Sequence, residues 1–228
     1  AYIAAFVFIL ICSLFLWFFD QEYNIFQSGL ASLNPFFIIA PWVFLLLIPA
    51  LTMKLIAEEQ NNGTLLWLFT QPINTQQIVL GKFFAVLSVL VFLLVLSFVY
   101  VYSLQQLVIP EQNIDYGILF SAYIGIFLIG TLFTSVGLLS SSLSNNQVIA
   151  FVLAVFINFI LYFGLQGLAS YNLLGNIDYY VLKMSAQTHF TSFLKGVIDT
   201  RSFLYFIILS TFFIFATMQI IELKKRKS

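Results

Sequence analysis

The chain has 228 residues, of which 61% are hydrophobic and only 8% are charged, and its formal net charge is zero. A soluble domain carries about 25% charged residues, so this composition excludes a soluble globular protein, which needs a polar coat. No basic patch indicates nucleic-acid binding. We therefore expect an all-α integral membrane protein in a single domain, residues 1–228, with the lipid bilayer as its surroundings.

Six apolar stretches approach the length of about 20 residues that a membrane-spanning helix needs. They are 1–19, 36–53, 83–103, 117–139, 148–168 and 203–221. The first lacks a preceding basic segment and a following cleavage site, so we interpret it as a membrane helix trimmed at its start and not as a signal peptide. It holds the single cysteine, Cys12, which we expect to be a small packing residue. The second and shortest stretch carries Pro41 and Pro49, which membrane helices tolerate when neighbours satisfy the freed carbonyls.

The connector 54–82 is expected to contain a short helix of its own. Asn62 and Gly63 should end the preceding helix, and the apolar residues 65–69 should form the short one. Pro72 should end it, because the residue before a proline is pushed out of the helical region.

A long third helix should follow this connector. Asn74 is a candidate cap, with Gln77 three residues on as its capping-box partner. A helix that continues to about residue 105 is longer than the hydrocarbon core, so it should project from the membrane.

The later segments leave alternatives open. Small residues recur along the fourth stretch and indicate either close packing within the chain or a helix that slides during transport. They are Ser121, Gly125, Gly130, Thr134, Gly137 and Ser141. Asn158 and Gln166 should bond between helices or line a substrate path. The polar loop 140–147 is either a plain turn or a second partner contact. The connector 169–202 has amphipathic pieces that favour the membrane surface, and its His189 should be solvated or a capping residue.

Basic residues set the expected orientation. Lys54, Lys82 and the tail 224–227 fall on one side of the predicted topology, whereas the other side holds fewer, in the connector 169–202. Basic residues near helix ends favour the cytoplasm. Both termini should therefore be cytoplasmic in an inner membrane, and the inverted topology is the alternative.

The spans lack the chemistry of several function classes. Residues 83–110, 116–177 and 202–221 contain no charged side chain, which counts against an ion-coupled carrier and a membrane-embedded metalloenzyme. One histidine excludes a histidine metal cluster. The only Gly-Lys pair, Gly81-Lys82, lacks the glycine that a phosphate-binding loop needs upstream. We expect no enzyme activity and no cofactor in this chain, so that any ATP must be hydrolysed by another chain.

The acids Glu58 and Glu59 allow two interpretations. They are either solvated interfacial acids or, with residues 65–69, part of a docking surface for a cytoplasmic partner. Trp67 and Phe69 favour docking, because aromatic side chains are enriched at protein interfaces.

The connector also resembles a known family. The string Glu58-Glu59, Gly63-Thr64, Leu68, Pro72-Ile73, 78–80 and Gly81-Lys82 is similar to the signature of type-2 ABC export permeases. The segment SSSLSNNQVIAF resembles the family's loop before the fifth span. Residues 15–42, with the loop signature, look most like the permease subunit of the gliding-motility-associated ABC transporter. The sequence departs from the family pattern at Gln60, Asn61 and Trp67.

This resemblance implies a fold and a set of partners. It implies six helices with a cytoplasmic coupling helix between spans 2 and 3, short outer re-entrant or interfacial helices between spans 5 and 6, and an N-terminal elbow helix that is missing here. It implies a dimer with a second permease, a copy or a paralogue, and ABC ATPase subunits that hold ATP and Mg. The coupling residues it implies are Glu58, Glu59, Gly63, Thr64, Leu68, Pro72, Gly81 and Lys82, with Ser144, Asn146 and Gln147 in the second cytoplasmic loop.

Three functions are therefore weighed. The first is the permease subunit of an ATP-driven exporter, in gliding motility or secretion. In this function Gly63 permits a tight entry to the coupling helix, Thr64 caps the helix and Pro72 fixes its exit. The second is a membrane scaffold of a motility or secretion complex that transports nothing. The third, an ion-coupled carrier, is disfavoured by the charge-free spans.

Overall fold

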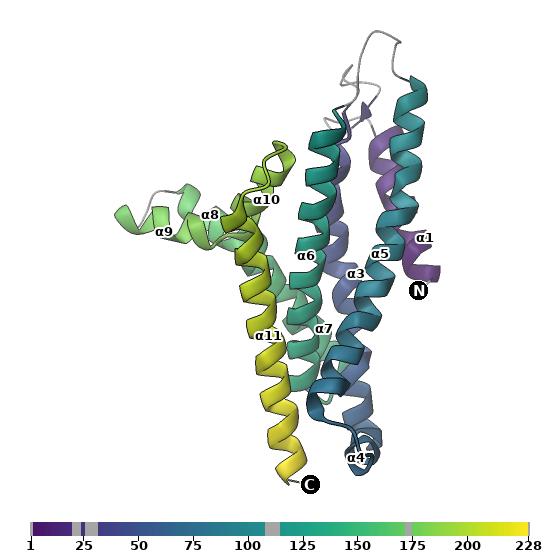
Figure 1. Ribbon diagram of the computed structural model, residues 1–228, viewed down its shortest axis with the longest axis vertical. Coiled ribbons are helices and arrows are strands. Elements are labelled where there is room, and N and C mark those ends of the chain that lie inside the picture. The colour runs from purple at the N-terminus through teal and green to yellow at the C-terminus, as the bar shows by residue number, and fades with distance from the viewer. Residues whose placement is uncertain (1, 20–23, 26–31, 108–114, 172–174, 228) are drawn as a thin grey trace.

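The computed structural model describes residues 2–19, 24–25, 32–107, 115–171 and 175–227, and every regular element among them is helical (Figure 1). In chain order the elements are α1 (Tyr2–Ser13), η1 (Leu14–Phe18), α3 (Asn34–Asn61), α4 (Thr64–Thr70), α5 (Thr75–Leu107), α6 (Tyr116–Leu143), α7 (Gln147–Phe159), η2 (Ile160–Gly164), α8 (Leu165–Ser170), α9 (Asn176–Met184), α10 (Ala186–Leu194) and α11 (Thr200–Lys227). The segments η1 and η2 are π-helical turns that continue α1 and α7. The prediction of an all-α chain is confirmed for these residues.

Five helices in this part of the chain are long and apolar enough to cross a membrane. They are Asn34–Asn61, Thr75–Leu107, Tyr116–Leu143, Gln147–Ser170 and Thr200–Arg226. The first predicted span corresponds to Tyr2–Phe18, which is shorter than the other five. The structure therefore shows a multi-pass membrane protein, and six crossings remain a prediction. With 33 residues, α5 extends over about 50 Å, against about 30 Å of hydrocarbon, as expected for a helix that projects from the membrane.

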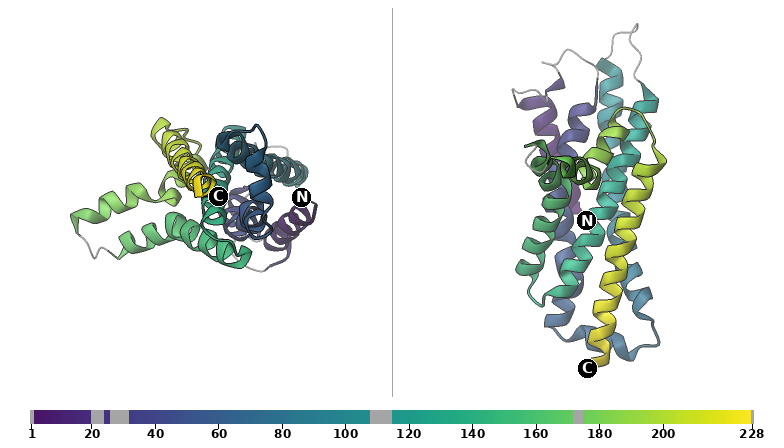
Figure 2. Two further views of the ribbon diagram at one scale, coloured as in Figure 1. Left: turned by 90° about the horizontal axis from the view of Figure 1, so that it is seen from below. Right: turned by 90° about the vertical axis from the view of Figure 1, so that its left-hand side faces the viewer.

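The helix α6 lies at the centre of the bundle, against α3, α5, α7, α10 and α11 (Figures 1 and 2). The small residues of α6 allow these helices to approach it closely. A Cβ atom at Gly125 would meet Phe190 and Phe193 of α10, one at Gly130 would meet Leu90 of α5, and one at Gly137 would meet Thr52 of α3. The small residues of α6 therefore pack within the chain, which was the first of the two interpretations.

In the half of the bundle away from α4, α1 packs on α3 and α5 through aromatic side chains and hydroxyl groups. Phe8 of α1 stacks on Phe44 of α3, with ring centroids 5.2 Å apart. The Tyr100 hydroxyl of α5 donates to the Ile9 carbonyl at 2.7 Å and lies 2.8 Å from the Ser13 hydroxyl. Cys12 is fully buried beside them, so its predicted packing role is confirmed.

The connector 169–202 forms an arm that projects sideways from the bundle and returns to it (Figures 1 and 2). The helices α8 and α9 pack on each other, and α10 lies on α6, where the Ser121 hydroxyl donates to the Phe193 carbonyl. His189 joins the pieces, because Nε2 lies 2.8 Å from the Lys183 carbonyl and Nδ1 lies 3.0 Å from the Ser202 hydroxyl. Its ring stacks on Tyr205. His189 therefore caps the end of α9. Of the two predicted roles, capping and a solvated side chain, the structure shows the first.

Asn158 of α7 is fully buried, and neither amide atom has a hydrogen-bond partner in the described part of the chain. The prediction that it bonds to another helix is wrong for these residues. A buried amide without a partner costs about 1–3 kcal/mol, so such a group in a membrane helix needs a reason other than stability.

We expect Asn158→Leu to stabilise the fold by about 1 kcal/mol, because leucine keeps the branched shape of the asparagine side chain and removes its unpaired amide. The measurement is thermal unfolding of the purified chain in one detergent. The control is Ser141→Ala. The Ser141 hydroxyl donates to the Met53 carbonyl and accepts from the Ile56 and Ala57 amides, so its loss should lower the melting temperature. A lower melting temperature for Asn158→Leu would show that its amide has a partner.

Candidate functional site

The short helix α4 lies at one end of the bundle, beyond the ends of α3 and α5 (Figure 1). The chain enters it through Gly63, whose φ of +72° is left-handed and costs a residue with a Cβ about 1 kcal/mol or more. This confirms the tight entry at Gly63. Thr64 is not the cap that the sequence suggested. Gly63 holds the N-cap position, so Thr64 is already helical, and its hydroxyl donates back to the Glu59 carbonyl at 3.3 Å.

The exit from α4 is also built as predicted. Gln71 is extended, with ψ of 152°, as the residue before Pro72 must be, and Pro72 is exposed. The Asn74 amide then donates to Gln77 Oε1 at 3.0 Å, which is one half of the predicted capping box at the start of α5. Both ends of α4 are therefore held by local backbone geometry.

The two faces of α4 differ in burial. Leu65 is 4% exposed, and Leu68 is half-buried. On the outer face Leu66 is 53% and Trp67 is 65% exposed. Thr70 Oγ1 donates to the Trp67 carbonyl at 2.8 Å in the last turn of the helix. The helix thus presents an aromatic and an aliphatic side chain away from the rest of the bundle.

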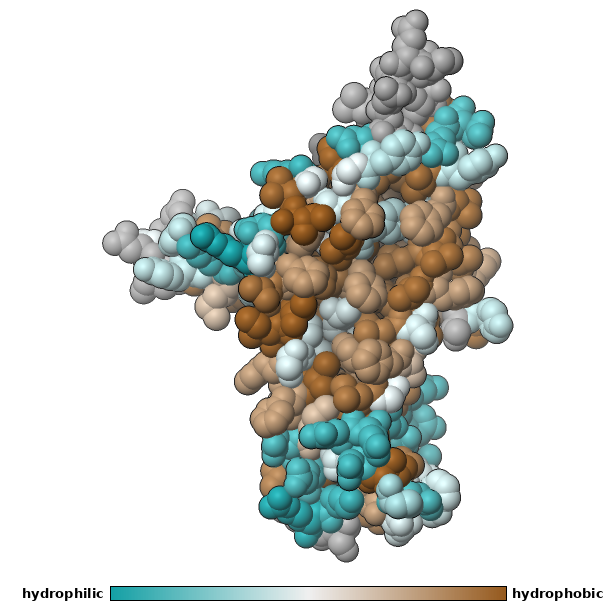
Figure 3. Space-filling model, viewed as in Figure 1, coloured by the Kyte–Doolittle hydropathy of each residue, from teal (hydrophilic) through white to brown (hydrophobic). Residues whose placement is uncertain are grey.

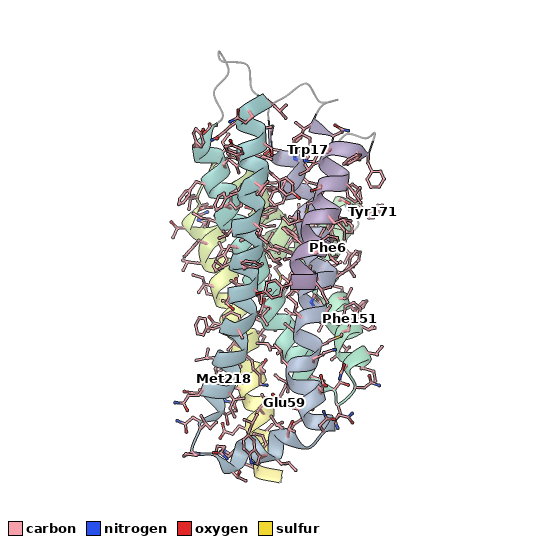
Figure 4. All side chains as sticks on the ribbon, turned by 90° about the vertical axis from the view of Figure 1, so that its right-hand side faces the viewer. Phe6, Trp17, Glu59, Phe151, Tyr171 and Met218 are labelled. Atoms are coloured by element: carbon pink, nitrogen blue, oxygen red, sulfur yellow. The ribbon has the colours of Figure 1, made fainter. Side chains whose placement is uncertain are left out.

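A charged pair at the base of α4 joins two of the predicted residues. Lys82 Nζ of α5 lies 2.5 Å from Glu59 Oε1 of α3 and donates to the Leu55 carbonyl at 2.5 Å. The side chains are only 14% and 30% exposed, so solvent screens the pair partially. Figure 4 shows Glu59 at this end of the bundle. The pair thereby ties α3, which precedes α4, to α5, which follows it.

The other predicted residues at this base differ in their environment. Glu58 is half-buried on the same turn as Glu59, and its carbonyl accepts the Asn62 amide at 2.9 Å. Gly81 is exposed, and a Cβ there would meet nothing within 4 Å. The structure gives Gly81 no steric role among the described residues.

We expect Lys82→Met to destabilise the fold by about 2 kcal/mol, because it leaves Glu59 and the Leu55 carbonyl without their donor. The matched control is Lys54→Met, since Lys54 is exposed near the same end and should tolerate the change. Thermal unfolding of the two variants in one detergent is the measurement. Equal melting temperatures would contradict a structural role for the pair.

A second polar cluster at this end was missed by sequence reasoning. Lys224 Nζ of α11 donates to Gln60 Oε1 of α3 and to the Ser142 carbonyl of α6, each at 2.7 Å. Gln60 Nε2 donates to the same carbonyl at 3.3 Å. Burial lowers the pKa of Lys224 from its usual value. The cluster joins three helices whose residues lie 82 and 164 positions apart, so no local signal marks it.

The loop between α6 and α7 lies at the same end of the bundle as α4 (Figure 2). Asn146 Oδ1 accepts the Val148 amide at 2.9 Å and caps α7, and the Ser144 hydroxyl accepts the Asn146 amide at 3.0 Å. Asn61 lines a polar pocket of about 290 Å³ together with residues 145–148, including Gln147. Ser144 and Asn146 therefore have turn-forming roles, and a partner contact at this loop stays a prediction.

The residues around α4 form a structural assembly at one end of the bundle. In the part of the chain that the structure describes, no group of three or more His, Cys, Asp or Glu side chains gathers to hold a metal ion. The site consists of an exposed apolar helix on two long helices, braced by a charged pair and a polar cluster.

Comparison with known proteins gives one match. A model of the ABC-2 family transporter proteins matches residues 3–207, which include α4, the charged pair and the loop between α6 and α7. A comparison with curated proteins found no match. Because the family model covers most of the chain, the chain belongs to the ABC-2 family of transporter proteins.

Proposed function

We propose that this chain is the permease subunit of an ATP-driven exporter, and that α4 couples a separate ATPase subunit to the membrane helices. The family implies a membrane permease that partners with an ABC ATPase subunit. The proposal goes beyond the family assignment in three respects. These are coupling through α4, export as the direction of transport, and a place in gliding motility or secretion. The motility role rests only on the resemblance of residues 15–42 and of the loop signature.

The exposed outer face of α4 carries the proposal. Leu66 and Trp67 are more than half exposed on a helix whose entry, exit and base are all held. An apolar pair in a rigid setting fits a groove on a partner better than it fits water, because little entropy is lost on binding. Lys82 and Glu59 then carry the displacement of α4 into α3 and α5.

The remaining parts of the proposal concern topology and assembly. The helix α4, the loop between α6 and α7, and the C-terminal end of α11 lie at one end of the bundle (Figure 1). Lys54, Lys82 and the tail 224–227 lie at that end, which favours the cytoplasm. We propose six crossings of a bacterial inner membrane, both termini cytoplasmic, outer helices α9 and α10 at the membrane surface, and a dimer of permeases. ATP and Mg would bind only to the ATPase.

Co-purification with the candidate ATPase in a mild detergent tests the proposal. The wild-type chain should retain the ATPase and stimulate its ATP hydrolysis. Replacing Thr64–Thr70 with a Gly/Ser linker of equal length should abolish both. If the ATPase does not bind the wild-type chain, or if the linker variant behaves like wild type, the coupling role is refuted. Binding to wild type without any change in hydrolysis would favour the scaffold.

A further inference from the structure

An apolar groove runs along the bundle between α5 and α11, with α6 as its floor. Figure 3 shows apolar side chains over this face of the molecule. Its volume is about 680 Å³. The walls include Phe84, Val91 and Val95 of α5, which are 60%, 46% and 54% exposed, and Phe203 and Ile207 of α11, which are 38% and 42% exposed. A second apolar hollow of about 260 Å³ shares Phe98, Phe120 and Tyr123 with the groove and extends it toward the end of the bundle that lies opposite α4.

A polar pocket of about 500 Å³ lies between the same two helices, nearer the end that carries α4. The start of α5 contributes Thr75 and Gln76 together with the preceding Asn74, and α11 contributes Glu222, Lys225 and Arg226. Arg226 pairs with Glu222 at 2.8 Å, and Lys225 lies 5.9 Å from the centre of the Phe69 ring. The pocket lining thus brings together two cations and one carboxylate.

The pocket and the groove lie on one face of the helix pair. Along α11 the lining residues 203, 207, 210, 214, 222 and 225 recur at helical spacing, and along α5 residues 76, 84, 87, 91 and 95 do the same. About 12 Å of helix separates Ile214 from Glu222. Figure 3 shows hydrophilic side chains at the lower end of this face and apolar ones above them.

We propose that this face binds an anionic phospholipid, with its phosphate in the pocket at Lys225 and Arg226 and an acyl chain in the groove along α5, α6 and α11. The groove offers an acyl chain almost no polar surface, and the cations of the pocket lining, Lys225 and Arg226, lie at the end nearer α4. This is the polarity of a lipid with an acidic head group. A helix from a second copy of the chain would also fill the groove, but it would not explain the positive charge at one end.

Native mass spectrometry of the full chain tests this, by titration with phosphatidylglycerol and with phosphatidylcholine of the same acyl chains. Wild type should bind phosphatidylglycerol about tenfold more tightly, because each basic residue at a membrane surface contributes to attraction for anionic lipid. Lys225→Gln with Arg226→Gln should lose that preference. The control, Lys54→Gln with Lys195→Gln, removes the same charge from exposed positions outside the pocket and should keep it.

Blocking variants test the acyl-chain half of the proposal. Thr131→Phe on the floor and Val95→Trp on the exposed rim should each weaken binding of both lipids severalfold. Ile208→Trp is the control, because Ile208 is 64% exposed on α11 but does not line the groove. Equal affinity for the two lipids in wild type would overturn the proposal, as would unchanged affinity in the pocket and rim variants. A dimer that the Val95→Trp variant dissociates, with no lipid retained, would assign the groove to a second copy.

Discussion

Replacing Leu66 and Trp67 together with glutamate should abolish binding of the ATPase subunit. Both side chains are more than half exposed on α4, and the change places two charges where an apolar groove is expected. Truncating a single interfacial tryptophan often costs 2–4 kcal/mol, so the affinity should fall by at least about 100-fold. The measurement is the dissociation constant of the purified chain and ATPase in one detergent.

The control for this prediction is Leu223→Glu. Leu223 is 55% exposed on α11 near the same end of the bundle. The variant therefore adds a carboxylate away from α4, at a position about as exposed as Leu66. Leu223→Glu should leave the affinity within about twofold of wild type, because an exposed position outside the docking face is nearly neutral. If both variants bind the ATPase normally, the docking surface lies elsewhere.

Replacing Gly137 with leucine should cause a large loss of stability. Even a Cβ at Gly137 would overlap Thr52, which is fully buried on α3, so the added side chain must push α3 and α6 apart. Overpacking of this kind costs about 3 kcal/mol, or about 6 °C or more in melting temperature for a chain of this length.

The control for this prediction is Gly167→Ala. A Cβ at this helical glycine of α8 meets nothing within 4 Å, so alanine should be neutral or should stabilise by about 0.5–1 kcal/mol. Thermal unfolding of both variants in one detergent gives the comparison. A Gly137→Leu variant that is as stable as wild type would contradict the close approach of α3 and α6.

Features set by local backbone chemistry were predictable from the sequence. Gly63, Pro72 and Gln77 act where the sequence placed them, because a left-handed turn, a proline and a capping side chain each constrain only their neighbours. Hydropathy also located five of the six predicted apolar stretches, although the helices extend beyond the predicted bounds. Thr64 was misjudged by one position, since Gly63 took the capping place.

Features that depend on the packing of distant helices were not predictable. Lys224 looked like one of four basic tail residues, yet it lies between Gln60 and Ser142 of two other helices. Glu59 and Lys82 were chosen from a sequence motif, but nothing in the motif says that they pair. The unpaired amide of Asn158 is likewise visible only once α7 is packed, because burial and partners are tertiary properties.

The rate of ATP hydrolysis by the ATPase subunit, reconstituted with this chain in lipid nanodiscs, tests the central claim most directly. The account predicts that the wild-type chain raises the rate. It also predicts that Lys82→Met, which leaves the outer face of α4 intact, retains the ATPase but loses most of that stimulation. A rate that is the same with the wild-type chain, with the Lys82→Met variant and with empty nanodiscs would contradict coupling through α4.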